Sequence, residues 1–168
     1  MFTVGIIVAS DQGAAGTRVD ESGPVAAEYM KKIGGEVKKT VIVKDERQAI
    51  AKALQILCDE DQLDLVITSG GTGFSVRDVT PEATCDVIER HIPGFSEIIR
   101  VTSYQSNPRA ILSRAVSGIR GKTIIINLPG SPRGVREALE IVGPSILHGI
   151  EILRGDASEC GHDQVHQY

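Results

Sequence analysis

One short segment of the chain, TSGGTG at residues 68–73, concentrates glycine and hydroxyl side chains. Glycine has no side chain to obstruct a ligand, so the backbone N–H groups of such a loop can approach phosphate oxygens closely. The candidate phosphate-binding residues are Ser69, Gly70, Gly71, Thr72 and Gly73. A tight turn between a strand and a helix explains the glycines equally well. No Gly-Lys-Ser/Thr follows and the spacing is not GxGxxG, so a Walker A ATPase and a dinucleotide-dependent oxidoreductase both lose support.

Two aspartates, Asp45 and Asp78, lie near predicted strand and helix ends and could face one ligand. Mg²⁺ takes one or two carboxylates together with phosphate oxygens and water, so the pair suits a magnesium site beside a phosphate loop. Each residue also has a purely structural explanation, because Asp45 could cap a helix and Asp78 could pair with Arg77 or stay solvated. The cations that could neutralise phosphate, each equally explained as a solvated surface charge, are Lys44, Arg77, Arg109 and Arg114.

Other reactive side chains do not form a recognisable catalytic group. Ser69 and Ser131 have no nearby Asp and His, and the G-x-S-x-G signature is absent. His91 and His148 have no partner at a metal-ligand spacing. The terminal CGHDQVH at 160–166 is more typical of a polar chain end than of a zinc site. The sequence therefore favours phosphate chemistry over serine or zinc hydrolysis.

The candidate residues follow segments that read as strands of an α/β sheet. Residues 2–9 and 63–69 are apolar runs, which predicts two buried parallel strands, and residues 36–43 are predicted to return as a further strand. Residues 115–128 predict two further strands around a Gly121-Lys122 turn, which could pair antiparallel. Ligands of open α/β sheets bind beyond the carboxyl ends of the strands, so the loops that follow these strands are expected to form the site.

Helices are predicted between and after these strands from capping residues, prolines and apolar periodicity. The expected helix starts are Ser22 as N-cap with Pro24, Asp45 with Gln48 as a capping box, Thr80-Pro81, Pro93-Gly94, the segment after LPGSP at 128–132, and Pro144 for a separate last helix.

The chain has 168 residues, the usual size of one domain, with no internal repeat. We expect one domain over 1–154 and a polar tail over 155–168. A net charge of -4 argues against nucleic acid and anionic membranes as partners. The start, MFTVGIIVAS at residues 1–10, lacks a basic n-region, and no apolar run approaches the ~18 residues that span a bilayer, so we expect a cytoplasmic protein. Cys58, Cys85 and Cys160 fit reduced thiols.

Four ordered segments of the chain carry a resemblance to a known family. They are SDQGAAGTRVDESGP at 10–24, TSGGTGFSVRDVTPEAT at 68–84, PGFSE at 93–97 and LSRAVSGIRGKTIIINLPGSP at 112–132. Together they resemble the molybdopterin adenylyltransferase family, which includes the bacterial MogA and MoaB proteins, the gephyrin G domain and its plant counterpart. The resemblance covers nearly the whole chain apart from the tail, and the ordered set of segments is far more specific than one glycine motif.

The resemblance implies a single three-layer α/β/α domain, the molybdopterin-binding fold, with a mostly parallel sheet and a pocket at the strand ends. It implies Mg²⁺-dependent transfer of AMP from ATP to the terminal phosphate of molybdopterin, with release of pyrophosphate. It gives the catalytic and metal-binding roles to Asp45 and Asp78. It gives nucleotide- or pterin-binding roles to Ser10, Asp11, Asp20, Ser22, Ser69, Gly70, Gly71, Thr72, Gly73, Arg77, Ser113, Asn127, Pro129, Gly130 and Ser131.

The resemblance also implies a homotrimer, or a hexamer, and a molybdenum-insertion protein as a partner. The family includes non-catalytic paralogues that bind a pterin or a partner protein as a carrier or scaffold. Asp45 and Asp78 favour the enzyme, because a pure binding protein has no need to keep both. The attacking group is an anionic phosphate, so the reaction needs no strong general base.

Overall fold

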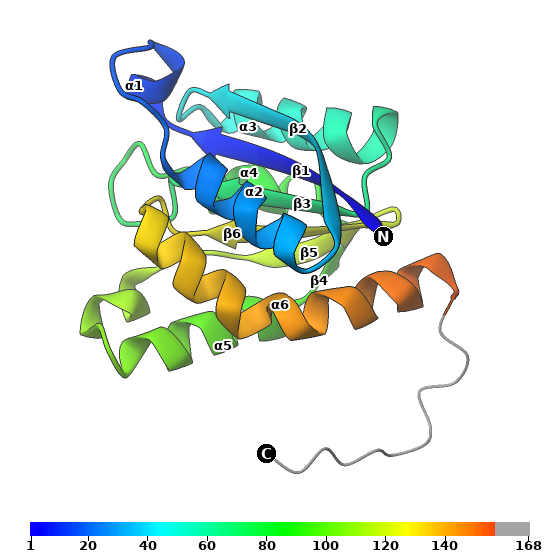
Figure 1. Ribbon diagram of the computed structural model, residues 1–168. Coiled ribbons are helices and arrows are strands. Elements are labelled where there is room, and N and C mark those ends of the chain that lie inside the picture. Colours follow the sequence, from blue (N-terminus) through cyan, green and yellow to red (C-terminus); the bar gives the residue numbers. More distant parts are fainter. Residues whose placement is uncertain (157–168) are drawn as a thin grey trace.

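The computed structural model describes residues 1–156, which form a six-stranded sheet with helices on both faces (Figure 1). The strand order across the sheet is β2-β1-β3-β6-β5-β4. The strands are β1 (Phe2–Ala9), β2 (Gly35–Val43), β3 (Leu65–Ser69), β4 (Arg90–His91), β5 (Ser117–Arg120) and β6 (Thr123–Leu128).

Four neighbouring strands, β2, β1, β3 and β6, run parallel, whereas β5 and the short edge strand β4 each pair antiparallel. The predicted turn at Gly121 joins β5 to β6, and Gly121 has a φ of 55°, which favours glycine. The expected three-layer α/β fold with a mostly parallel sheet is confirmed. The pairing of β4 adds an edge strand that the sequence did not predict.

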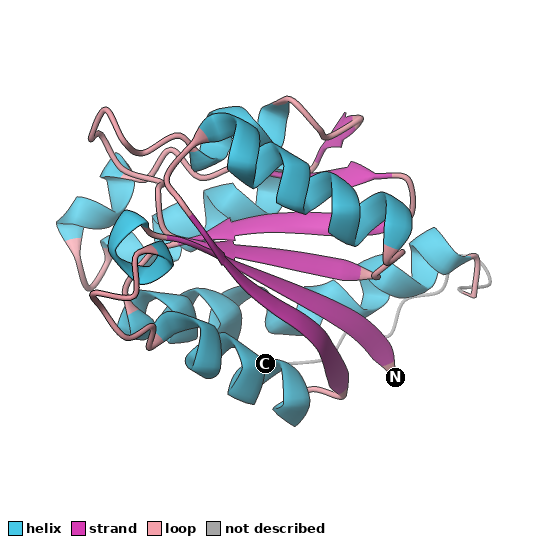
Figure 2. Ribbon diagram, turned by 90° about the horizontal axis from the view of Figure 1, so that it is seen from above, coloured by secondary structure: helices cyan, strands magenta, loops and turns pink. Residues whose placement is uncertain are grey.

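Helices flank both faces of the sheet (Figure 2). They are α1 (Asp11–Ala14), α2 (Ser22–Lys32), α3 (Arg47–Gln55) with a π-helical extension η1 (Ile56–Glu60), α4 (Thr80–Cys85), α5 (Pro93–Tyr104), the 3-10 helix η2 (Pro108–Leu112) and α6 (Pro132–Arg154).

Two apolar clusters fill the spaces between the sheet and its helices. One joins Ile6 and Ile126 to residues of α2, α5 and α6, and the other joins Ile7 to residues of α3, η1 and α4. Both faces of β1 are therefore buried, which explains its continuous apolar sequence. No helix within residues 1–156 combines the length and the apolar character needed to cross a membrane.

Two predicted helix boundaries are wrong. Pro144 does not start a new helix, because α6 continues through it to Arg154, and Val142 and Ile146 stay buried on one continuous face. The proline removes one backbone hydrogen bond, a loss that this packing offsets. Ser22 is the first residue of α2 rather than its cap. The N-cap position is held by Glu21, whose side chain makes no capping bond, and the Asp20 carboxylate accepts from the backbone N–H groups of Ser22 at 2.9 Å and Gly23 at 3.0 Å instead.

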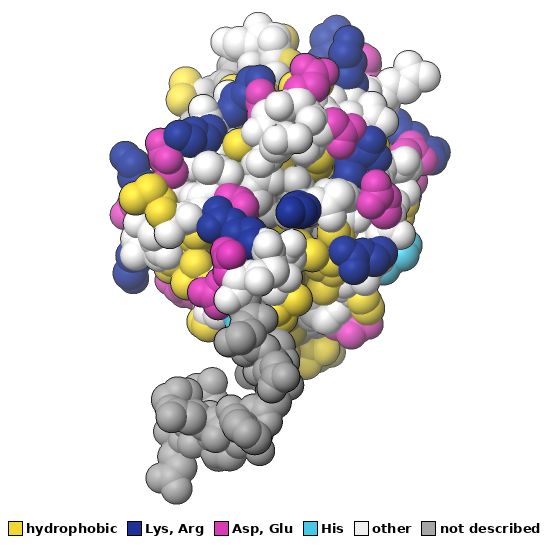
Figure 3. All heavy atoms as spheres, turned by 90° about the vertical axis from the view of Figure 1, so that its right-hand side faces the viewer, with side chains coloured by type: hydrophobic (Ala, Val, Ile, Leu, Met, Phe, Trp, Pro, Cys, Tyr) yellow, Lys and Arg dark blue, Asp and Glu magenta, His cyan; other side chains and the backbone are white. Residues whose placement is uncertain are grey.

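The end of the sheet seen in Figure 3, where the parallel strands begin, carries basic and acidic side chains in alternation. Ion pairs there join Lys39 to Asp61 and Arg154 to Asp64, so the charges are largely compensated. The carboxyl ends of the parallel strands meet at the opposite end, where the candidate site lies.

Candidate functional site

The loops that follow β1, β3 and β6 approach one another closely at Gly70. The Gly70 N–H donates to Leu128 O at 3.2 Å, and its φ of 97° lies in a region that side chains disfavour. A Cβ on Gly70 would stand 2.5 Å from Ala9 O, and a Cβ on Gly130 would stand 3.2 Å from the Gly70 Cα. Glycine is thus required at the meeting point of three strand-end loops.

The next two glycines of the loop lie against the two candidate carboxylates. A Cβ on Gly71 would stand 3.3 Å from Asp45 Oδ1, and a Cβ on Gly73 would stand 2.8 Å from Asp78 Oδ2. Thr80 Oγ1, which would also meet a Gly71 side chain, is buried and lacks a hydrogen-bond partner within residues 1–156. The backbone of the glycine loop therefore lies directly against both candidate carboxylates, although neither Asp45 nor Asp78 lines either of the two pockets described below.

Asp11 and Asp45 are joined by reciprocal hydrogen bonds between backbone and carboxylate. The Asp11 N–H donates to Asp45 Oδ2 at 2.9 Å, and the Asp45 N–H donates to Asp11 Oδ1 at 3.1 Å. Arg77 then binds the Asp11 carboxylate in a bidentate manner, at 3.0 Å and 2.9 Å. The three residues connect the loops that follow β1, β2 and β3.

The surroundings of these two aspartates shift their pKa values in opposite directions. The Arg77 guanidinium lowers the pKa of Asp11, mainly through its hydrogen bonds. Burial is the main cause that raises the pKa of Asp45, and the nearby Asp11 and Asp78 carboxylates raise it further. A buried carboxylate with like charges around it is stabilised by a cation, which is what a metal ion or a cationic side chain would supply.

The predicted capping box at Asp45 is wrong. The residue that precedes α3 is Glu46, and no side chain caps the helix. The Asp45 carboxylate accepts from Asp11 across the site instead, because its strand-end position directs it there rather than onto the helix. A helix-capping role therefore does not explain the presence of Asp45.

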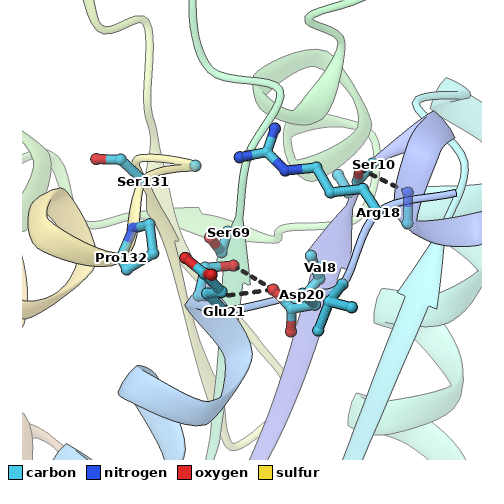
Figure 4. Close-up of a pocket in the computed structure, with 14 residues that line it drawn as sticks. Val8, Ser10, Arg18, Asp20, Glu21, Ser69, Ser131 and Pro132 are labelled. Carbon is cyan, nitrogen blue, oxygen red and sulfur yellow. Dashed lines mark hydrogen bonds between the residues drawn. The ribbon is translucent and has the colours of Figure 1, made fainter.

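A pocket of about 410 Å³ opens between the loops after β1, β3 and β6. Figure 4 shows Arg18 extending over it, with Ser69 below and Ser131 on the far side. The hydroxyls of Ser10 and Ser131 accept from the N–H groups of Gly13 and Gly134, so their own protons can point to a ligand. The predicted site residues that line it are Ser10, Asp20, Ser22, Ser69, Gly70, Gly130 and Ser131.

The N-terminal ends of α2 and α6 also face this pocket through Ser22, Ser131 and Pro132. The partial positive charge of a helix N-terminus favours an anion. Arg18 is the one Lys or Arg that lines the pocket within residues 1–156, and the sequence analysis missed it. Its position in the loop that follows β1, shortly before the start of α2, is the signal that could have shown it.

A second pocket, of about 260 Å³, lies on the other side of the glycine loop and shares Ser131 with the first. Its cations are Arg100 and Arg109, of which Arg100 is hydrogen-bonded to Ala115 O at 2.8 Å. The predicted site residues that line it are Thr72, Gly73, Ser113, Pro129 and Ser131. Two spaces that meet at Ser131 suit two ligands held side by side.

The predicted phosphate-neutralising cations have different surroundings. Arg77 is bound to Asp11, and Arg114 is bound to carbonyls of the glycine loop and to Glu82. Arg109 lines the second pocket, and Lys44 is exposed and helps to lower the pKa of Asp11.

The structure does not bring Asn127 into either pocket. Its side chain is fully buried and donates to the hydroxyls of Thr68 at 2.9 Å and Thr84 at 2.8 Å. It also accepts from Val116 N at 3.2 Å. Asn127 therefore ties β6 to its neighbours, and the sequence could not show this because its position at a strand end fits both roles.

The donor set of the site fits Mg²⁺. No three His, Cys, Asp or Glu side chains of residues 1–156 gather into a metal-binding group, so an ion at the glycine loop would have at most the two carboxylates of Asp45 and Asp78. Mg²⁺ keeps its other coordination positions for phosphate oxygens and water, which two carboxylates beside an unobstructed glycine loop permit. Cys160, His162 and His166, the other group considered, lie outside the described residues.

Fold and site together define an α/β protein that offers hydroxyls, a helix N-terminus and cations to anionic ligands beside two carboxylates. Residues 5–148 match the family described as "Probable molybdopterin binding domain". The chain belongs to this family, and the resemblance found in the sequence is confirmed.

Relatives with known names match most of the chain. The molybdopterin adenylyltransferase of Helicobacter pylori (strain J99) is 41% identical over 98% of this chain and 95% of that protein. The Escherichia coli K12 protein of the same name is 40% identical over 88% of this chain and 78% of that protein. The crystal structure of the molybdopterin biosynthesis enzyme MoaB from Thermus thermophilus has a TM-score of 0.88, with 43% identity over 92% of this chain and 98% of that one.

Proposed function

We propose that this protein is a molybdopterin adenylyltransferase of molybdenum cofactor biosynthesis. It transfers AMP from ATP to the terminal phosphate of molybdopterin and releases pyrophosphate. The observation that carries the proposal is the placement of Asp45 and Asp78 beside Gly71 and Gly73, the side-chain-free part of the loop between two pockets. The names of the relatives in Helicobacter pylori and Escherichia coli support the same reaction.

Two anionic substrates must lie close together in this reaction, and their repulsion is the main obstacle. The first pocket counters it with Arg18 and the N-terminal ends of α2 and α6, against the carboxylates of Asp20 and Glu21 that also line it, and the second pocket counters it with Arg109. The hydroxyls of Ser10 and Ser131 add donors without adding charge. Binding and alignment by these groups therefore supply much of the catalysis.

Asp45 and Asp78 would hold Mg²⁺. When bound, the ion would offset negative charge on the reacting phosphates and on the leaving pyrophosphate. Asp11 keeps Asp45 in place through the Asp45 N–H, and Arg77 keeps Asp11 in place. The attacking phosphate of molybdopterin is already anionic, so the site needs no histidine or other general base.

The purified protein should convert molybdopterin to its adenylylated form when ATP and Mg²⁺ are present. The products, adenylylated pterin and pyrophosphate, are measured by chromatography and a coupled pyrophosphate assay. Chelation of divalent cations should stop both, and restored Mg²⁺ should bring both back. Pterin binding without either product would instead indicate a non-catalytic carrier or scaffold.

We also propose that the protein assembles as a homotrimer in the cytoplasm and passes its product to a molybdenum-insertion protein. Exposed apolar side chains on α5 and η2 support a self-contact: Ile98, Val101, Tyr104, Ile111 and Leu112. Cys58 and Cys85 are free thiols, which a reducing compartment preserves. Analytical ultracentrifugation tests the assembly, and a monomer at micromolar concentration would contradict it.

A further inference from the structure

Arg114 lies between η2 and β5, and its guanidinium binds the protein's own glycine loop. Nε donates to Gly73 O at 2.7 Å, Nη2 donates to Asp78 O, and Nη1 pairs with Glu82 Oε1. The Arg114 backbone N–H donates to Thr72 O at 2.8 Å. One residue therefore holds carbonyl groups from both ends of the loop that carries Asp78.

This loop gains little stability from burial of its own side chains. Phe74 is 69% exposed and Val76 is 94% exposed. Inside the loop, Ser75 N–H donates to Asp78 Oδ2 at 2.9 Å and Asp78 N–H donates to Ser75 O at 2.9 Å. These bonds fix Asp78 relative to Ser75 but do not fix either residue relative to Asp45. That relationship depends on contacts with the rest of the protein, namely the pair that Arg77 of the loop forms with Asp11 and the bonds that the loop backbone forms with Arg114.

We infer that Arg114 is a positioning residue for adenylyl transfer, because it fixes the glycine loop and the backbone of Asp78 relative to Asp45. The inference rests on the proposed function. Arg114 lines neither pocket, and three of its N–H groups are occupied within the protein. It therefore acts through Gly73 and Asp78 and does not serve as the phosphate-neutralising cation considered from the sequence.

Arg114→Lys tests this inference, because lysine keeps the positive charge but has one compact ammonium in place of a planar fork. It cannot reach Gly73 O, Asp78 O and Glu82 together. Arg120→Lys is a matched control at the opposite end of the sheet. Arg120 also pairs with a carboxylate, that of Asp59, and donates to a carbonyl, Val87 O at 2.9 Å.

Four quantities are measured for wild type and both variants: melting temperature, kcat, KM for each substrate, and amide hydrogen exchange of residues 72–79. We expect Arg114→Lys to lower kcat by about 10- to 100-fold with KM nearly unchanged, since small misplacements of reacting groups cost that much. Exchange in 72–79 should become faster. Arg120→Lys should leave kcat and the hydrogen exchange of residues 72–79 at wild-type values. Its melting temperature should fall by about as much as that of Arg114→Lys.

Glu82→Gln provides a second variant if Arg114→Lys does not fold, because it weakens the anchor of Arg114 and leaves the arginine in place. It should change kcat and exchange in the same direction by a smaller factor. A wild-type kcat in folded Arg114→Lys or in Glu82→Gln, or a raised KM with unchanged kcat in these two variants, would overturn the inference. An inactive wild-type protein would refute the proposed function instead, and the exchange measurement would still decide whether Arg114 holds the loop.

Discussion

Asp11 and Asp45 each accept a hydrogen bond from the other's backbone, with Asp11 N to Asp45 Oδ2 at 2.9 Å and Asp45 N to Asp11 Oδ1 at 3.1 Å. This pair joins the ends of β1 and β2. Because Arg77 binds Asp11 as well, the loop after β3 is tied to the same point. The orientation of Asp45 is thus set by neighbours from two other loops.

Asp11→Asn and Asp11→Ala should differ in activity. Asparagine keeps an oxygen that can accept from Asp45 N–H, so adenylyl transfer should change little. Alanine removes the acceptor and releases Arg77, and we expect a loss of about tenfold or more because Asp45 is no longer held. Initial rates at saturating substrate measure this. An equal loss in both variants would mean that the bidentate pair of Asp11 with Arg77, which asparagine also breaks, matters more than the bond to Asp45 N–H.

Asp64 should make stability depend on pH in the acid range. Burial alone would raise its pKa, but hydrogen bonds from Arg154 and Thr3 outweigh burial and lower the pKa from 3.8 to about 2. A lowered folded-state pKa contributes stability that is present above 3.8 and lost as pH falls toward 2. We expect about 2 kcal/mol of the free energy of unfolding to vary in this window.

This contribution is measured by urea unfolding of the wild type and of Asp64→Asn. The pH is varied between about 2 and 5, the range in which the carboxyl group titrates. The variant should be less stable at neutral pH, and its stability should fall less steeply with acid. Parallel pH profiles for the two proteins would show that Asp64 is not the group responsible.

Gly70→Ala should destabilise the protein more than Gly121→Ala. Both glycines have positive φ, 97° and 55°, so alanine is strained at each. At Gly70 the new Cβ would also stand 2.5 Å from Ala9 O, whereas at Gly121 no heavy atom lies within 4 Å. We expect a cost of about 1 kcal/mol for Gly121→Ala and about 3 kcal/mol for Gly70→Ala by urea unfolding. If both variants lost the same free energy of unfolding, the loops after β1 and β3 would have to move apart at little cost to accommodate the new Cβ at residue 70.

Arg18→Gln should weaken binding of one anionic substrate. Arg18 extends over the first pocket, where a charge-assisted hydrogen bond to phosphate contributes enough to change KM about tenfold. We expect kcat and the melting temperature to stay near wild type. Arg90→Gln, an exposed charge on β4, serves as the control and should leave both KM values unchanged. A wild-type KM for both substrates in Arg18→Gln would show that Arg18 does not contribute to binding either substrate.

Much of the fold could be predicted because buried strands and helices have apolar residues in recognisable patterns. The run at 2–9 is buried on both faces of the sheet, so its residues are continuously apolar. The prediction of a helix start at Pro144 is wrong because it rests on local backbone preference alone. Packing of the long apolar face of α6 keeps the helix continuous through this proline. The edge strand at Arg90 has two exposed residues and left no apolar pattern to find.

The site was predictable at the strand ends but not in its contacts. Asp45, Asp78 and the glycine loop do lie together, since parallel strands bring their carboxyl ends to one edge. The partners of Arg77 and Arg114 could not be predicted, because long charged side chains choose among carboxylates and carbonyls that only tertiary packing brings near. Arg18 could have been predicted from its place in the loop that follows β1, because site residues are expected in the loops after the strands.

We propose that the negative charges of the Asp45 and Asp78 carboxylates act in the reaction, whereas the hydrogen bonds that these side chains accept within the loops need only a neutral oxygen. Asp45→Asn and Asp78→Asn keep the shape of each side chain and one oxygen. The asparagine can still accept from Asp11 N–H or Ser75 N–H, so the melting temperature should hardly change. Each variant loses the negative charge that a cation at the phosphates requires.

The decisive measurement is the rate of adenylylated molybdopterin formation by these two variants under conditions where the wild type is saturated. We predict a loss of about 100-fold or more for each, comparable to losing an electrostatic transition-state contact of roughly 3 kcal/mol. Melting curves recorded on the same samples confirm that they are folded. A folded Asp45→Asn or Asp78→Asn protein that forms the product at the wild-type rate would contradict the account.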